Sequence, residues 1–503
     1  MPEQGCPEQP AAREYIRKML RYRGDIRAWG LVAAVLLAAA SARADTIVLK
    51  NGRRIAALSV TEDGDKIRYE TAAGTLTLPK AIVDRVERGG ADQERAASAD
   101  SLSLKPPDAT AADSKLDAGR SAVETRVIRD GEVDRDYLGK LENLASSGSS
   151  LANWNAAAAL HTAAQFELAH HDMDLALEDE RHALIYAPEQ PVFLMNIAYL
   201  HLRRSEYTQS LEYLERARRV APEDADVAKL TGWAYYGLNK LDEAVAQWKH
   251  ALALRPDAEV GAALAKALRD KREEEQYKEN DSSHFTLRYS GAAEPALAHD
   301  ILRTLEHHYD AIESELGYSP PDAIGVILYT QQAFADITQA PTWVGALNDG
   351  RIRVPVQGLS GVTPELSRVL KHELTHSFVQ QKTRGHAPTW MQEGLAQWME
   401  GKRSDTAAAA LIGMYGAAPD QVAVHFEGNW MKMSNEAAAV SYAWALANVE
   451  CIMNSGGMGD LDRIMDRLAT GEPAETATRA VTRSGYAELT SETVEFLRRN
   501  YNP

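Results

Sequence analysis

The chain has 503 residues, more than a single hydrophobic core usually organises, so its length predicts about three folded domains. Its composition, 45% hydrophobic and 25% charged, is that of an ordinary soluble protein. Asp and Glu together number 72, against 55 Lys and Arg. Because an acidic surface repels phosphate backbones, and because no basic stripe interleaved with aromatic residues occurs, we expect no nucleic-acid partner.

The N-terminal residues have the pattern of a signal peptide. Three arginines precede an apolar run at 29–40, and about a dozen apolar residues are too few to cross a bilayer core of about 30 Å as a helix. Ala42 and Ala44 supply the small residues that a signal peptidase requires. Residues 1–44 are therefore predicted to direct export to the periplasm or cell envelope and to be removed. Translation from Met19 and an uncleaved membrane anchor are the alternatives.

The two cysteines agree with this reading. Cys6 lies in the predicted signal peptide, so Cys451 would remain alone in the mature chain. No internal disulfide can then form, and a zinc site built on a pair or a quartet of cysteines is excluded.

Residues 45–90 are predicted to form a small all-β module. Short alternating runs at 46–49, 66–71 and 75–78 are separated by glycine-containing turns, a pattern typical of strands joined by tight turns. The stretch resembles the SH3-like or Sm-like modules near the start of exported bacterial proteins, which implies a docking or spacer role and names no ligand.

Residues 91–135 are rich in Ala, Asp, Ser, Lys and Pro and contain few large apolar side chains. A segment of this composition cannot bury enough surface to offset the loss of chain entropy. We therefore expect a flexible linker.

An internal repeat occupies residues 136–275. Three prolines follow one another at intervals of 34 residues, a period diagnostic of repeated helical hairpins. Small residues recur at two further phases of the repeat, where antiparallel helices must approach closely. The prolines are Pro188, Pro222 and Pro256, and the small residues are Ala176, Ser210 and Ala244, then Ala183, Ala217 and Ala251.

The repeat resembles the tetratricopeptide repeat, most fully in its third copy. The resemblance implies a concave face that could hold a peptide or a protein partner, with Trp233 and Tyr236 as candidate contacts. Aromatic residues at helical spacing are also common in cores, so the array could equally hold domains apart. A capping helix is expected near 260–277. The matching positions are Gly232, Tyr235, Ala244, Trp248, Ala251 and Pro256, and the implied face adds Met195, Tyr199 and Lys229.

Residues 276–503 are predicted to form an α+β domain. A strand at 284–289, a helix at 294–316 and an apolar strand at 323–329 follow one another. The segment 350–354 alternates charged and apolar residues and ends at a proline, which is typical of an edge strand.

Arg351 and Arg353 are candidate substrate contacts on this edge strand. An edge strand beside an active site can pair with the main chain of an extended peptide. A solvated edge that binds nothing is the alternative.

A helix at 364–381 is well marked, with Thr363 as its N-cap and Pro364 at the first helical position. His372 and His376 are four residues apart and project from one face of this helix. Two imidazoles at this spacing can bind one Zn²⁺ ion.

Two further glutamates complete the predicted site. Glu373 can reach the open coordination position and take a proton from water there. Glu393, in a second helix that ends near Gly401, is the expected third ligand. Gly394 within that helix costs about 1 kcal/mol relative to alanine, which is understandable if the two helices must pack closely.

The sequence HELTH, followed after sixteen residues by the glutamate of WMQEGLAQW, resembles the gluzincin branch of zinc peptidases, and most of all the peptidase MA-like domains joined to tetratricopeptide repeats. The resemblance implies a thermolysin-like zincin fold, His372, His376 and Glu393 as zinc ligands, and Glu373 as general base. Thermolysin-like members carry an aspartate four residues after the glutamate ligand, where this chain has Gln397. The amide oxygen of Gln397 could accept the hydrogen bond from a ligand histidine, although less strongly than a carboxylate.

A peptidase also needs a donor for the oxyanion that develops on the attacked carbonyl. Tyr442, in a helical run at 441–451, is the candidate, and His386 and His425 are alternatives. Each of these side chains could also be an ordinary packing or surface residue.

Together these patterns predict an exported zinc-dependent metallopeptidase that acts on a peptide or protein. One alternative is a noncatalytic adaptor whose repeats bind partners while the zincin domain is a relic or a regulatory surface. A second alternative is a zinc amidase that acts on a non-protein substrate of the cell envelope.

Overall fold

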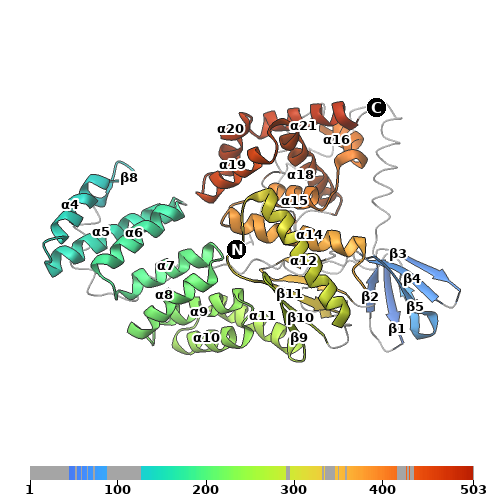
Figure 1. Ribbon diagram of the computed structural model, residues 1–503, viewed down its shortest axis with the longest axis horizontal. Coiled ribbons are helices and arrows are strands. Elements are labelled where there is room, and N and C mark those ends of the chain that lie inside the picture. The colour runs from blue at the N-terminus through green and yellow to red at the C-terminus, as the bar shows by residue number, and fades with distance from the viewer. Residues whose placement is uncertain are drawn as a thin grey trace, which may run out of the picture. The chain divides into compact units, whose positions relative to one another are not determined.

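The computed structural model of the chain is mostly helical, with a small mixed sheet and a separate set of short β strands (Figure 1). The predicted signal peptide, and the predicted linker up to residue 125, lie outside the described residues. Among the described helices, none combines the length and apolar character needed to cross a bilayer. The structure describes residues 45–50, 54–57, 59–64, 66–71, 74–87, 126–170, 172–290, 295–330, 333–334, 346–348, 350–356, 359–415, 426, 430 and 435–501.

Residues 45–87 contain two antiparallel three-stranded sheets, in the orders β2-β1-β6 and β3-β4-β5. The three strands predicted from alternation are confirmed as β1, β4 and β5. Buried residues of β1, β3, β4 and β6 share a small core of Ile47, Val60, Ile67, Tyr69 and Val83. The strands are β1 (Asp45–Leu49), β2 (Arg54–Ala57), β3 (Ser59–Asp63), β4 (Lys66–Thr71), β5 (Gly74–Pro79) and β6 (Val83–Glu87).

A helical array follows, in which α5 packs on α6, α7 on α8 and α9 on α10 (Figure 1). Regular structure begins within the predicted linker, before residue 136. There β7 (Ile128–Arg129) pairs with β8 (Glu132–Val133), and Val127 is buried. The helices are α4 (Arg135–Ala145), α5 (Ser150–Ala169), α6 (Met173–Tyr186), α7 (Pro191–Arg203), α8 (Tyr207–Val220), α9 (Ala225–Gly237), α10 (Leu241–Leu254) and α11 (Ala258–Glu274).

Close helix contacts explain the repeated small residues. Both sets predicted from the 34-residue period are buried, and each period proline lies in a connection between helices. A Cβ atom at Gly232 would lie 2.3 Å from Nε1 of Trp248, so only glycine allows α9 and α10 to approach this closely. The expected concave face is not exposed, however: Met195, Tyr199, Lys229, Trp233 and Tyr236 are all buried.

The C-terminal unit contains a five-stranded mixed sheet in the order β12-β13-β11-β10-β9. The central strands β10, β11 and β13 are parallel, while β9 and β12 run antiparallel at the two edges. The prediction that 350–354 forms an edge strand is therefore wrong, because the two-residue strand β12 covers β13. The strands are β9 (Lys278–Asp281), β10 (Phe285–Tyr289), β11 (Ile324–Tyr329), β12 (Leu347–Asn348) and β13 (Ile352–Pro355).

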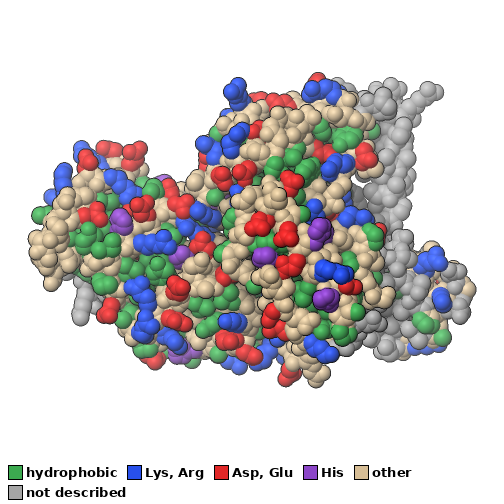
Figure 2. All heavy atoms as spheres, viewed as in Figure 1, with side chains coloured by type: hydrophobic (Ala, Val, Ile, Leu, Met, Phe, Trp, Pro, Cys, Tyr) green, Lys and Arg blue, Asp and Glu red, His purple; other side chains and the backbone are tan. Residues whose placement is uncertain are grey.

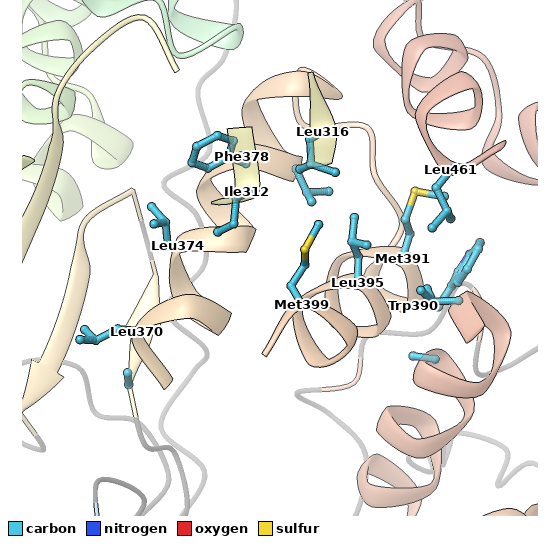
Figure 3. Packing of buried hydrophobic residues seen from close by; sticks show 14 of the residues in the cluster. Ile312, Leu316, Leu370, Leu374, Phe378, Trp390, Met391, Leu395, Met399 and Leu461 are labelled. Atoms are coloured by element: carbon cyan, nitrogen blue, oxygen red, sulfur yellow. The ribbon is translucent and has the colours of Figure 1, made fainter. Parts of the chain in front are cut away.

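One hydrophobic core joins this sheet to the helices of the unit. Figure 3 shows Leu374 and Phe378 of α14 near Ile312 of α12, and Leu395 and Met399 of α15 in the same cluster. The helices are α12 (Pro295–Leu316), α14 (Pro364–Lys382), α15 (Thr389–Met399), α16 (Ala408–Tyr415), α18 (Asn435–Gly456), α19 (Met458–Ala469), α20 (Ala474–Thr482) and α21 (Tyr486–Tyr501).

Acidic and basic side chains are interspersed over the face drawn in Figure 2. The acidic side chains on that face thus do not form one continuous acidic area.

Candidate metal centre

Helix α14 places two imidazoles side by side. The Thr363 hydroxyl caps the helix by accepting a hydrogen bond from the Leu366 amide at 3.0 Å, as the sequence predicts. The apolar side of the helix is buried in the core of the C-terminal unit. His372 and His376 lie on another side, each with a little under a fifth of its side chain exposed. The helix thus fixes both rings at the edge of the core, where an ion can reach them.

Helix α15 brings the Glu393 carboxylate to the same point. Nε2 of His372 lies 3.2 Å from Nε2 of His376, and Oε2 of Glu393 lies 3.5 Å and 3.7 Å from these two nitrogens. Ligands at 2.0–2.1 Å around a tetrahedral ion are separated by about 3.3 Å. Among the described residues, this is the group of His, Cys, Asp and Glu side chains that could hold a metal ion. Its spacing fits such an ion.

The second ring nitrogen of each histidine has its own acceptor. Nδ1 of His372 lies 3.3 Å from Oε1 of Glu400, and Nδ1 of His376 lies 3.4 Å from Oε1 of Gln392. Oxygen acceptors at Nδ1 favour the tautomer with the proton on Nδ1. When the imidazoles are neutral, as metal ligands are, the lone pair on each Nε2 is then directed to the point shared with Glu393.

Gln397 does not act as the resemblance suggested. Its amide nitrogen donates to the carbonyl oxygens of Glu393 at 3.1 Å and of Tyr442 at 2.9 Å. Gln397 thus ties α15 to α18, and the contact with His372 is made by Glu400. Sequence reasoning missed Glu400 and Gln392. Glu400 had a detectable signal, since residues seven apart, such as Glu393 and Glu400, share one helix face.

Gly394 is required by a different neighbour from the one expected. A Cβ atom at this position would lie 2.4 Å from the carbonyl oxygen of Ala445, in α18. The atoms nearest to such a Cβ atom thus belong to α18, although α15 also contacts α14. This close approach brings the helix that carries Tyr442 against the helix that carries Glu393.

Burial and charge set the protonation of the site. Burial raises the pKa of the Glu373 carboxyl above its usual range, against the lowering effect of the two imidazoles. Burial alone would lower the pKa of His372, but hydrogen bonds to Glu393 and Glu400 raise it to about 10. Burial would raise the pKa of Glu393, but His376 and His372 lower it. Glu393 is thereby kept anionic, as a metal ligand must be, while Glu373 has an increased affinity for a proton.

The backbone of Glu373 is attached to the edge of the sheet. The side-chain amide of Asn348, in β12, donates to the Glu373 carbonyl oxygen at 2.9 Å and to Oγ of Ser377 at 2.7 Å. The edge strand β12 is thus fixed against α14, close in the chain fold to the two histidines.

Tyr442 lies at the cluster. Burial raises the pKa of its phenol, and the charges of Glu393 and Glu373 together with a hydrogen bond to Glu393 raise it further. Tyr442 is therefore a neutral hydrogen-bond donor at neutral pH. Of the alternatives, Nδ1 of His386 lies 3.0 Å from the Leu468 carbonyl oxygen, and His425 lies outside the described residues.

Two of the predicted substrate residues occupy a buried polar network instead. The side chains of Arg351 and Arg353 are 1% and 0% exposed, and they pair with Asp270 and Glu274 of α11 at 2.7–3.2 Å. Nη1 of Arg353 also donates to the Tyr329 hydroxyl at 2.7 Å. Arginines without exposed surface cannot touch a bound peptide, so the structure corrects their predicted role.

The predicted aromatic contacts of the array are also internal. Nη2 of Arg353 donates to the Tyr236 hydroxyl at 3.2 Å, and that hydroxyl donates to Asp270 at 3.1 Å. The Trp233 ring is buried against Trp248, with centroids 5.1 Å apart. Arg353, a predicted substrate contact, and Tyr236, a predicted partner contact of the array, thus contact each other where the array meets the sheet.

Comparison with known proteins adds no relative from which a role could be transferred. No model of a protein family matches the sequence, and no curated protein is significantly similar to it. The geometry of His372, His376 and Glu393, together with the groups around them, therefore indicates the function of the site.

Proposed function

We propose that the chain is a zinc-dependent metallopeptidase with His372, His376 and Glu393 as ligands of one Zn²⁺ ion. The observation that carries this proposal is the spacing of the three ligand atoms, 3.2–3.7 Å from one another. Two nitrogen donors and one carboxylate are a common set for catalytic zinc, which keeps its fourth position for water or substrate. The same donors would suit magnesium or calcium poorly, because those ions prefer oxygen.

The residues around the ligands support hydrolysis of an amide. A bound zinc ion would supply Lewis acidity, polarising the scissile carbonyl and lowering the pKa of water. Glu373 takes a proton from the attacking water and returns it to the leaving amine, which its raised pKa favours. Tyr442 donates a hydrogen bond to the oxyanion. Among the described strands, β12 lies at one edge of the sheet, where an extended peptide could pair with it.

The finer fold assignments belong to this proposal. The buried small residues of α6, α8 and α10 and the 34-residue period support tetratricopeptide repeats. The mixed sheet with α14 and α15 supports a thermolysin-like zincin unit. We also propose export through a signal peptide at 1–44, which predicts that the mature protein begins at Asp45 when its N-terminus is sequenced.

The test combines metal analysis with a proteolysis assay on three forms of the full mature protein: the parent, Glu373→Gln, and Glu365→Gln. Glu365 is a matched control, because it lies on the same helix, is half exposed and pairs with Arg368 instead of a metal ligand. We expect about one zinc per chain in all three forms. Cleavage is expected in the parent and the control and not in Glu373→Gln.

Three outcomes would contradict the proposal or change it. A parent protein that binds no zinc would refute the metal site. Zinc in all three forms with cleavage in none would favour the adaptor. Loss of cell-envelope amide hydrolysis in Glu373→Gln, without any cleavage of proteins by the parent, would favour the amidase.

A further inference from the structure

Glu400 occupies an unfavourable place in helix α15. It is the C-cap residue, where the negative end of the helix dipole disfavours a carboxylate. Only 6% of its side chain is exposed, so water does little to stabilise the charge. A buried acid at a helix C-terminus must gain compensating interactions from its neighbours.

The imidazole of His372 and the ammonium group of Lys402 supply that compensation. Oε1 of Glu400 lies 3.3 Å from Nδ1 of His372 and 2.8 Å from Nζ of Lys402. Lys402 is more than half exposed, so its ammonium group joins the pair from the solvent side. The carboxylate thus sits between a ligand imidazole and a lysine.

The end of the helix builds this arrangement. Gly401 has a φ of 95°, the left-handed conformation that glycine adopts most easily. The Gly401 amide donates to the Trp398 carbonyl at 3.1 Å, and the Lys402 amide donates to the Gln397 carbonyl at 3.0 Å. These two bonds are those of a Schellman motif, which turns the chain back at the helix end. The turn carries Lys402 over Glu400.

Gln397, about one turn before Glu400, already binds other partners. Both amide hydrogens of Gln397 are matched by carbonyl oxygens, those of Glu393 and Tyr442. Gln397 therefore holds α15 against α18, and the acceptor for His372 comes from the next turn of α15.

We propose that Glu400 is the positioning residue of the metal centre: it fixes the tautomer and orientation of His372 from two helical turns beyond Glu393, with Lys402 holding its carboxylate in place. This inference rests on the proposed zinc site and names a determinant of its affinity. A carboxylate at Nδ1 keeps the proton on that nitrogen, directs Nε2 to the metal and increases the electron density of the ring.

The test measures the zinc dissociation constant of the full chain by competition with a chromogenic chelator. The variants are Glu400→Leu, Glu400→Gln and the matched control Glu450→Gln. Glu450 is also a buried carboxylate of this region, but it accepts from the Ser404 amide and the Tyr501 hydroxyl instead of a ligand histidine. Circular dichroism spectra and thermal midpoints establish that each variant is folded.

We expect Glu400→Leu to bind zinc about 10–100-fold more weakly than the parent. Glu400→Gln should lie between the two, because its amide oxygen accepts the Nδ1 hydrogen bond but carries no charge. Glu450→Gln should bind as the parent does. In the cobalt-substituted protein, the visible absorption bands should shift in both Glu400 variants and stay unchanged in the control, because they report ligand geometry.

Unchanged zinc affinity in Glu400→Leu would overturn the inference while leaving the zinc site intact. Equal losses in Glu400→Gln and Glu450→Gln would overturn it as well, because they would show a general effect of losing a buried carboxylate. A parent chain that binds no zinc would overturn both this inference and the proposed function.

Discussion

Replacing Arg353 by methionine should destabilise the protein strongly. The Arg353 guanidinium donates to both carboxylate oxygens of Asp270, at 3.1 Å and 2.9 Å, and to the hydroxyls of Tyr329 and Tyr236 at 2.7 Å and 3.2 Å. Removing one partner of a buried ion pair costs about 3–5 kcal/mol, because the other charge stays buried. Asp270 keeps Arg351 at 3.2 Å, so we expect about 3 kcal/mol.

Urea unfolding monitored by tryptophan fluorescence measures this loss. For an m value of about 3 kcal/mol/M, the midpoint should fall by about 1 M. The control is Arg368→Met, which removes an exposed ion pair with Glu365 and should cost less than about 1 kcal/mol. The double variant Arg353→Met with Asp270→Leu should be more stable than Arg353→Met alone, since an apolar pair leaves no buried charge.

The same variant distinguishes two roles for Arg353. If the arginine contacted substrate on an exposed edge, Arg353→Met would raise KM and leave the urea midpoint unchanged. That result would refute the buried network and restore the role predicted from the sequence.

Three further outcomes follow from the structure. Gly394→Ala should lower the free energy of unfolding by about 1–2 kcal/mol, because overpacking against the Ala445 carbonyl outweighs about 1 kcal/mol of gained helix propensity. It should also weaken zinc binding in chelator competition. A thermal midpoint above that of the parent would contradict the close contact. Glu167→Gln should raise the thermal midpoint at pH 8 but not at pH 5. Burial and the charge of Asp179 raise the pKa of Glu167 to about 8. The folded parent therefore binds more protons than the unfolded chain and loses stability as the pH rises from about 4.5 towards 8. An equal effect at both pH values would contradict this burial. Tyr442→Phe should reduce kcat on the order of 100-fold with zinc content unchanged, and a wild-type kcat would exclude the oxyanion role.

The sequence predicts most reliably what depends on local periodicity. His372, Glu373 and His376 lie within one helix whose N-cap is recognisable, so their common face follows from the helical repeat. The 34-residue period likewise predicts which small residues of the array are buried. In both cases the relevant neighbours are separated by one helical turn or one repeat.

Positions that depend on distant partners could not be predicted in the same way. Alternating charge at 351–354 is typical of an exposed edge, yet β13 is internal because β12 pairs with it and because Asp270 and Glu274 neutralise its arginines from α11. Gly394 indicates close packing, but the sequence of one helix does not reveal which neighbouring helix approaches it.

Glu400 illustrates a third kind of limit. The resemblance to thermolysin-like proteins points to Gln397, one turn after Glu393, and not to the acid two turns after it. The side chain that contacts His372 is decided by how α15 rotates against α14 and α18, which no local pattern specifies.

The proposed zinc ion binds between α14 and α15. A crystal structure of the zinc-loaded protein with an anomalous difference map at the zinc absorption edge tests it directly. We expect a single peak at about 2.0–2.1 Å from Nε2 of His372, Nε2 of His376 and a carboxylate oxygen of Glu393. A map without a peak at this point, or with Glu393 turned away from both imidazoles, would contradict it.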